Sequence, residues 1–183
     1  LMKFQTEAGV LEGTPERLIV AGWTGRDRAA VDHHIAELAE IGVPAPSTVP
    51  LYYQCAPILL TQETEIQALG DETSGEAEPF LFKLSGTVWL GLASDHTDRA
   101  LEAHSVAASK QICAKPVANV LWPLETLKSH LDDLVLRSWI EESGGWIPYQ
   151  DGKLSSILPL EQLMAGAPLL EGTAMLCGTL PAI

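Results

Sequence analysis

The chain has 183 residues, 46% of them hydrophobic, which is enough for one compact domain with a buried core. Its 24 acidic and 11 basic side chains give a formal net charge of −13, and this charge would repel nucleic-acid phosphates and an anionic membrane surface alike. No run approaches the roughly 20 apolar residues of a bilayer-spanning helix, and the first residues lack the order of a signal peptide. We therefore expect a cytoplasmic protein that binds neither nucleic acid nor membrane.

The first predicted elements are a strand and a helix. An apolar run at residues 16–21, closed by glycine, indicates a buried strand. In residues 27–41 apolar side chains recur at spacings of three and four, and Gly42 and Pro44 follow, which is typical of a helix and its end. His34 and Glu37 lie one turn apart beside the apolar stripe, so both can face the same space.

The remaining segments alternate between short strands and short helices. Two β-prone runs at residues 80–84 and 87–92 flank Ser85-Gly86, and this arrangement predicts a hairpin. A second hairpin is expected where residues 134–140 lead through Gly144-Gly145 into WIPYQDG. Further elements are expected as helices at residues 98–110, 124–131 and 158–164, and as an apolar strand within GTAMLCGT. The pattern indicates a β-rich α+β domain without internal repeats.

One domain spans residues 1–183 in this interpretation. The sequence opens on Leu1 and stops just after an apolar segment, at GTLPAI, so we expect terminal strands to be missing from it. Cys55, Cys113 and Cys177 are widely separated and form no CxxC pair. This spacing indicates buried, reduced thiols rather than a disulfide framework or a zinc ribbon.

Three acidic residues lie at one end of the first predicted hairpin. Glu76 and Glu78 are two residues apart at the mouth of a strand, so both carboxylates point the same way, and Asp95 stands at the end of the partner strand. Like charges so placed repel unless a cation lies between them, and carboxylate oxygens completed by water suit Mg²⁺ or Mn²⁺. The alternative is that both glutamates are solvated at a loop edge, and that the segment with His96 and Asp98 only caps a helix.

Five pieces of the sequence follow one another in order: His34 and Glu37, Glu76 and Glu78, Asp95 with Thr97 and Arg99, Lys110 with Pro116, and Gly178 with Thr179. Taken together they resemble the fumarylacetoacetate hydrolase superfamily. That family carries an HxxE on a short helix, an ExE metal pair, a metal-binding Asp followed by Thr and Arg, a later lysine, and a closing Gly-Thr. Five ordered pieces are far more specific than any one of them.

The resemblance implies a fold, a metal and an activity. The fold would be a β-rich mixed sheet arranged as a roll or sandwich, with a few short helices, and the protein a homodimer. The activity would be cleavage of a C–C bond in a small 2-oxo or 1,3-diketo acid, of the acylpyruvate or fumarylpyruvate type, by a hydrolase that depends on Mg²⁺ or Mn²⁺. Such a metal polarises a carbonyl and stabilises the enolate that leaves.

The resemblance also assigns roles to individual residues. Glu76, Glu78 and Asp95 would hold the metal. A water would be positioned and deprotonated by the HxxE pair, and a lysine would neutralise negative charge that develops near the metal. The catalytic residues implied are His34, Glu37 and Lys110, and the substrate-binding residues are Arg99, Gly178 and Thr179.

Several alternatives stay open at this point. His34 can be a half-buried helix residue bonded to Glu37, and Lys110 can be a surface lysine, with Lys115 competing for the family position. The segment between the ExE pair and Asp95 is compressed, and Thr173 stands where the family has aspartate. On the same scaffold a 2-oxo acid decarboxylase, tautomerase or hydratase needs the same metal-bound enolate. A non-catalytic metal-binding or small-molecule-binding protein is the remaining class.

Overall fold

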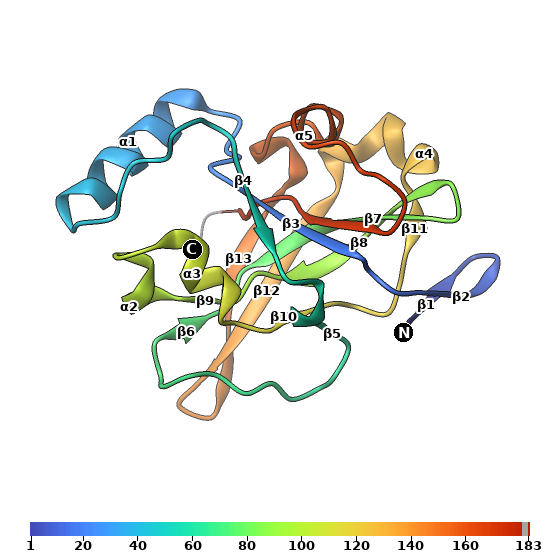
Figure 1. The fold of residues 1–183 in the computed structure, drawn as a ribbon, viewed down its shortest axis with the longest axis horizontal. Coiled ribbons are helices and arrows are strands. Elements are labelled where there is room, and N and C mark those ends of the chain that lie inside the picture. Colours follow the sequence, from blue (N-terminus) through green and yellow to red (C-terminus); the bar gives the residue numbers. More distant parts are fainter. Residues whose placement is uncertain (181–182) are drawn as a thin grey trace.

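A computed structural model describes residues 1–180 and 183 of the chain (Figure 1). Its centre is a six-stranded mixed sheet in the order β11-β8-β7-β14-β3-β4. Strand β14 (Thr173–Leu176) lies parallel to β3 (Arg17–Gly22) and antiparallel to β7 (Ala77–Leu84). Among the residues that the structure describes, the other strands form two-stranded pairs, β1-β2, β5-β10, β6-β9 and β12-β13. The architecture is the α+β, sheet-centred arrangement that the sequence predicts.

The remaining elements are short. The other strands are β1 (Met2–Thr6), β2 (Gly9–Gly13), β4 (Leu51–Cys55), β5 (Leu60–Thr61), β6 (Thr73–Ser74), β8 (Thr87–Ser94), β9 (Thr97–Asp98), β10 (Lys115–Pro116), β11 (Trp122–Pro123), β12 (Val135–Glu142) and β13 (Gly145–Lys153). The α-helices are α1 (Arg28–Glu40), α2 (Arg99–Glu102), α3 (Val106–Gln111), α4 (Leu124–Leu127) and α5 (Leu160–Gly166), and 3₁₀ turns cover Pro57–Leu59, Lys128–Asp133 and Leu154–Ser156. Among residues 1–180 and 183, no helix is long and apolar enough to cross a membrane.

The sheet buries a hydrophobic cluster on each face. Successive side chains of β7 point to opposite faces, so Phe80 and Phe82 enter one cluster while Leu81 enters the other. All three are fully buried, and each contributes about 1.5–3 kcal/mol through removal of apolar surface from water. The three cysteines are free and buried, as the sequence predicts. The polar site lies at one end of strands β7 and β8.

Several predicted elements are confirmed. Helix α1 lies within the predicted range, and its N-terminus is capped by Asp27, whose carboxylate accepts hydrogen bonds from two backbone amides. The first hairpin turns at Ser85 and Gly86, both at positive φ, as a tight β-hairpin turn requires. The second hairpin turns at Ser143-Gly144, one residue before the position expected.

Two helix predictions are wrong in extent. The single helix expected at residues 98–110 is two helices, α2 and α3, because Ser105 adopts an extended conformation and its hydroxyl caps α3 by accepting from Ala108 N–H. The helix expected at residues 124–131 ends as α4 at Leu127 and continues as a 3₁₀ turn. The N-terminal hairpin β1-β2 and the strand β4 have no counterpart in the sequence prediction.

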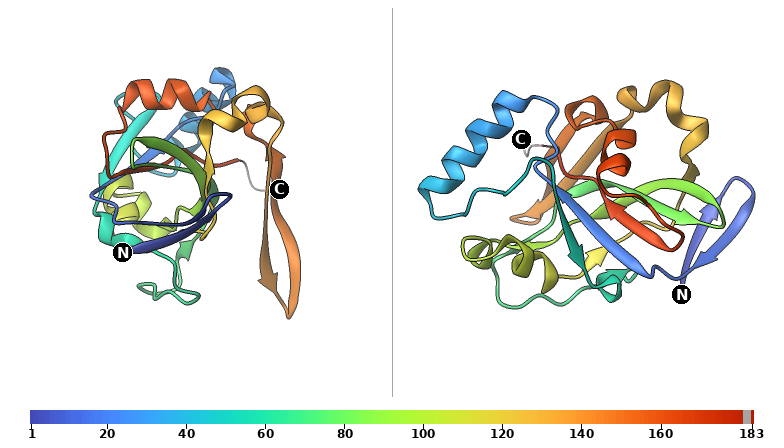
Figure 2. Two further views of the ribbon diagram at one scale, coloured as in Figure 1. Left: turned by 90° about the vertical axis from the view of Figure 1, so that its right-hand side faces the viewer. Right: turned by 45° about the horizontal axis from the view of Figure 1, so that its top comes forward.

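The hairpin β12-β13 extends away from the rest of the fold, and Figure 2 shows it in profile. Its outer half carries the exposed side chains of Trp139 and Trp146. Its inner half reaches the sheet, where Leu136 joins a hydrophobic cluster and Gln150 is buried.

Candidate functional site

Three carboxylates gather where the hairpin β7-β8 opens. The strands pair Ala77 with Ser94, and just outside the ladder Asp95 N–H donates to the carbonyl of Glu76 at 2.9 Å. Glu78 is only 2% exposed and Asp95 only 1%. The surface alternative is therefore wrong for Glu78, while Glu76 keeps part of its side chain in solvent.

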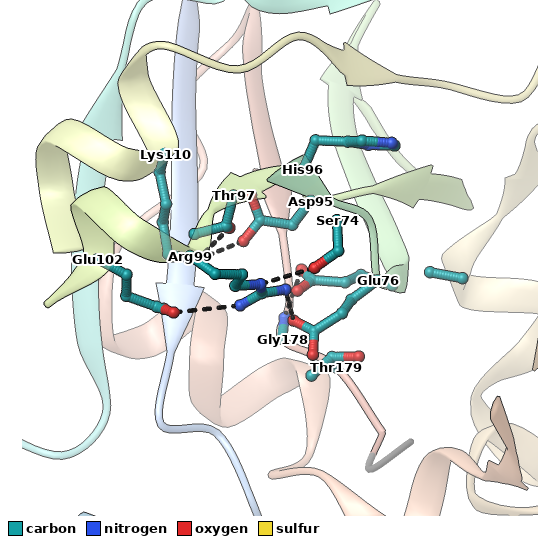
Figure 3. Close-up of polar contacts among 12 residues, drawn as sticks. Ser74, Glu76, Asp95, His96, Thr97, Arg99, Glu102, Lys110, Gly178 and Thr179 are labelled. Carbon is teal, nitrogen blue, oxygen red and sulfur yellow. Dashed lines mark hydrogen bonds and ion pairs between the residues drawn. The ribbon is translucent and has the colours of Figure 1, made fainter. Parts of the chain in front are cut away.

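Two lysines meet Asp95 from different elements. Lys110 on α3 places Nζ 2.5 Å from Oδ2 of Asp95 (Figure 3). Lys115 on β10 places Nζ 2.8 Å from Oδ1 of the same carboxylate. Lys115 is completely buried and also donates to the carbonyl of His96. The structure thus places both competing lysines at the site, and Lys110 is not a surface residue.

Burial and charge act against each other in this cluster. Burial opposes the charged form of Lys110, but the attraction of Asp95 and Glu78 prevails and raises its pKa. Burial likewise opposes ionisation of Asp95, yet Lys110 and Lys115 lower its pKa. For Glu78, burial first and repulsion by Asp95 second raise the pKa well above its ordinary value. Lys110 and the Gly178 N–H act in the opposite direction but do not prevail, so the charge of Glu78 is only partly compensated.

Arg99, at the start of α2, occupies the outer side of the cluster. Its guanidinium lies 3.4 Å from Glu76 and 3.3 Å from Glu102, and its Nε donates to the hydroxyl of Ser74 at 2.7 Å (Figure 3). Arg99 therefore neutralises Glu76 from the solvent side. As a residue assigned to substrate binding, it lies beside the predicted metal ligands.

Gly178 approaches the cluster through its backbone. Its N–H donates to Oε2 of Glu78 at 2.9 Å. Its φ is +91°, and a Cβ there would lie 1.7 Å from Oγ1 of Thr24, so only glycine fits. The neighbouring Thr179 accepts a hydrogen bond from the side chain of Gln150, a buried residue of β13. Gln150 belongs to none of the sequence motifs and was missed by the sequence analysis.

His34 and Glu37 lie apart from the carboxylates. Both are on α1, where the His34 side chain is 61% exposed and its Nδ1 lies 3.6 Å from Glu37, and Nε2 of His33 comes closer, at 3.2 Å. The His34 ring faces Trp23, with ring centroids 6.2 Å apart. Within residues 1–180, neither His34 nor Glu37 forms a hydrogen bond or ion pair with the carboxylate cluster.

The chemistry of the cluster fits a hard divalent cation. Oδ1 of Asp95 is buried and accepts no hydrogen bond, although Lys115 lies near it, and the charge of Glu78 is poorly compensated. A cation between these oxygens would satisfy both. With the side chains as placed, no three His, Cys, Asp or Glu groups of the described residues form a ligand set. Asp95 is turned to lysines and Glu76 to Arg99, so metal binding requires these side chains to rearrange.

Comparison with known proteins places this geometry in context. A family model for a protein of unknown function, DUF2848, matches residues 21–183. No curated protein matches the sequence.

Solved structures share the fold at low sequence identity. A candidate fumarylacetoacetate isomerase/hydrolase from Oleispira antarctica matches 99% of this chain and 86% of its own, with a TM-score of 0.67 and 16% identity. The 2-keto-3-deoxy-D-arabinonate dehydratase complexed with magnesium and 2,5-dioxopentanoate matches 91% of this chain and 63% of its own, with a TM-score of 0.65 and 16% identity. The 5-carboxymethyl-2-hydroxymuconate delta-isomerase from Mycobacterium smegmatis matches 95% and 70%, with a TM-score of 0.60 and 16% identity. These structures share the fold of this chain, and the predicted fold, that of a fumarylacetoacetate hydrolase, is confirmed.

Proposed function

The chain belongs to the DUF2848 family, and for this member of a family of unknown function we propose a divalent-metal-dependent enzyme that acts on a small 2-oxo acid. The observation that carries the proposal is the pair of buried carboxylates, Glu78 and Asp95, with two lysines beside them. Burying a charged group costs free energy, and buried charged groups are typical of functional sites. A dehydratase of the same fold has been solved with magnesium and a dioxo acid, which supports this class of substrate.

Glu76, Glu78 and Asp95 are the residues that would hold Mg²⁺ or Mn²⁺. When bound, the ion supplies Lewis-acid stabilisation of an enolate oxygen. For the protein, the cation would offset the effects that raise the pKa of Glu78, which are burial first and repulsion by Asp95 second. Arg99 would then hold Glu102 and Ser74 while Glu76 turns toward the metal.

The specific reaction that we propose is hydrolysis of a C–C bond in an acylpyruvate. Water adds to the acyl carbonyl and gives one proton to His34, which Glu37 orients. The bond between the acyl carbon and the methylene carbon breaks, and its electron pair passes to the departing pyruvate enolate. That enolate takes up a proton and leaves as pyruvate, while the acyl group leaves as a carboxylate. Lys110 would stabilise the developing oxyanion, and Arg99, Gly178 and Thr179 would bind the substrate carboxylate.

The position of α1 favours a second candidate reaction on the same scaffold. His34 is largely exposed and does not touch the carboxylate cluster, so hydrolysis requires α1 to approach the site. Dehydration, decarboxylation or isomerisation of a 2-oxo acid would use the same enolate without a water activated from α1. A dehydratase and an isomerase are among the proteins of similar fold.

One assay separates these candidates. The protein is incubated with Mg²⁺ and a panel of acylpyruvates and 2-keto-3-deoxy acids, and loss of the enol absorbance and the products are measured. Hydrolysis predicts pyruvate together with a second carboxylate, and activity that falls in His34→Ala and in Lys110→Ala. Isomerisation predicts one product, dehydration one organic product with water, and decarboxylation one organic product with CO₂. In each case His34→Ala should leave the activity unchanged. Activity untouched by both substitutions would contradict the proposed mechanism.

A further inference from the structure

Gln150 on β13 connects two parts of the site that are far apart in the sequence. Its side chain is 1% exposed. Its Oε1 accepts from Ala77 N–H at 2.8 Å and from the Ser138 hydroxyl at 2.6 Å. Its Nε2 donates to Oγ1 of Thr179 at 2.7 Å and to the carbonyl of Leu180 at 3.1 Å, with a longer contact of 3.3 Å to the carbonyl of Ala77. The side-chain amide of Gln150 therefore makes most of its hydrogen bonds with residues in or next to the candidate site.

The first of these elements is the backbone between the two glutamates. Ala77 is the residue between Glu76 and Glu78, and Gln150 holds both its N–H and its carbonyl. The orientation of this residue sets where the two carboxylates project, because neighbouring side chains of a strand point to opposite faces and alternate ones to the same face. Gln150 thus fixes the spacing of two predicted metal ligands.

The second element is the hydroxyl of Thr179. Thr179 Oγ1 accepts from Gln150 and donates to the carbonyl of Leu180 at 3.0 Å. Since Gln150 donates to the same carbonyl, Leu180 keeps a partner when the Thr179 proton turns elsewhere. With Gln150 donating to its oxygen, the Thr179 hydroxyl is left to act as a donor, which is what a carboxylate ligand needs.

We propose that Gln150 is a positioning residue of the site, which fixes the Glu76–Glu78 pair through Ala77 and directs the Thr179 hydroxyl toward a carboxylate ligand. The inference rests on the proposed function, because both groups it holds are assigned to metal and substrate. It extends the site to the hairpin β12-β13, from which none of the motif residues comes.

Metal affinity tests the first part. Mn²⁺ binding is titrated by electron paramagnetic resonance for wild type, Gln150→Met and Ser138→Ala, with circular dichroism to verify folding. Methionine keeps the shape of the side chain and removes all its hydrogen bonds, and the expected result is Mn²⁺ binding about 10-fold weaker or more. Ser138→Ala removes only the hydrogen bond that the Ser138 hydroxyl donates to the Gln150 amide. We expect its Mn²⁺ affinity to stay within about 2-fold of wild type. Equal affinity in Gln150→Met and wild type would overturn the proposal.

Coupling to Thr179 tests the second part in a way that a general loss of stability would not mimic. Binding of oxalate to the Mn²⁺-loaded protein is measured for wild type, Gln150→Met, Thr179→Val and the double variant. If Gln150 acts through Thr179, the double variant loses about as much oxalate affinity as the Thr179 variant alone. Additive losses would overturn the proposed direction of the Thr179 hydroxyl.

Two further outcomes keep the test decisive. If Gln150→Met does not fold, Gln150→Glu replaces it, since glutamate keeps an oxygen for Ala77 N–H and loses the amide donor to Thr179. About 10-fold weaker oxalate binding supports the proposal, and unchanged binding overturns it. Failure of the wild type to bind Mn²⁺ overturns the proposed function together with this inference, whereas normal wild-type binding with unaffected variants overturns this inference alone.

Discussion

Lys110 places its Nζ 2.5 Å from the Oδ2 of Asp95, and both side chains are buried. This pair sits where the sequence motifs predict a metal ligand. The lysine thus supplies positive charge to a carboxylate that a divalent cation would also bind. We therefore expect Lys110 and the metal to compete for Asp95.

Replacing Lys110 by methionine should change stability and metal affinity in opposite directions. Loss of a buried charge partner costs about 3–5 kcal/mol when no other partner remains, and Lys115 still contacts Asp95, so we expect a loss of about 1–3 kcal/mol. Mn²⁺ affinity should rise several-fold, because one cation that competes for Asp95 is gone. Urea unfolding and Mn²⁺ titration measure both quantities. Lys153→Met, which breaks an exposed pair with Asp133, serves as the control and should change neither. A fall in Mn²⁺ affinity for Lys110→Met would show that the lysine supports the metal site.

The metal-free protein should become less stable as pH rises, through Glu78. Burial and the nearby Asp95 raise the pKa of Glu78, so the folded protein holds this proton more tightly than the unfolded chain does. Above the ordinary pKa of glutamate, stability is therefore lost as pH rises toward the raised value.

The variant Glu78→Gln has no such proton and tests this directly. With a chelator present, we expect it to exceed the wild type in stability by about 1 kcal/mol or more at pH 8, and by less at pH 5. Urea unfolding at the two pH values provides the comparison, with Glu72→Gln on an exposed loop as the control. A stability difference that does not change with pH would count against the assignment.

The two neighbouring histidines of α1 form a matched pair. Both are exposed and both approach Glu37, but only His34 matches the predicted catalytic position. For a hydrolase, His34→Ala should lower kcat by about 10²-fold or more, as loss of a general base does, while His33→Ala should leave kcat within about 2-fold. Thermal unfolding should be nearly the same for both variants. Equal effects on kcat would mean that the helix, and not the imidazole of His34, matters.

Substitution of Gly178 should destabilise the protein more than substitution of another glycine with a similar φ. Gly178 and Gly42 have φ values of +91° and +96°, but a Cβ meets Thr24 at the first and nothing within 4 Å at the second. Gly42→Ala should cost about 1 kcal/mol from backbone strain alone. Gly178→Ala should cost clearly more and also weaken Mn²⁺ binding, since its N–H holds Glu78. Chemical denaturation compares the two, and equal costs would contradict the close packing against Thr24.

The fold was predictable where local patterns decide it. The β-prone runs at residues 80–84 and 87–92 around the Ser85-Gly86 turn predict the first hairpin, and the apolar spacing within residues 27–41 predicts α1. The break between α2 and α3 was not predictable in this way. The helix formers there read as continuous, and the competing hydrogen bond of the Ser105 side chain becomes visible only in the structure.

Part of the candidate site was predictable from the sequence, but the contacts between its residues were not. Motif order identified Glu76, Glu78, Asp95 and Gly178, and the structure brings them together. Their pairing with cations, and the presence of both lysines at Asp95, depend on contacts between α3, β10 and the sheet that no local pattern encodes. Gln150 lies beyond motif reasoning because its partners Ala77, Thr179 and Leu180 are more than 25 positions away, and those on Ala77 and Leu180 are backbone atoms. Ser138 is nearer, at 12 positions, but belongs to no motif.

Stoichiometric metal binding tests the central claim most directly. Mn²⁺ is titrated into the wild type and into Glu76→Gln and Asp95→Asn, with Asp71→Asn as an exposed control. The account predicts one ion per chain for the wild type and the control, and binding weakened by about 10-fold or more in the two site variants. Absence of a bound ion in the wild type, or equal uptake in all four proteins, would contradict it.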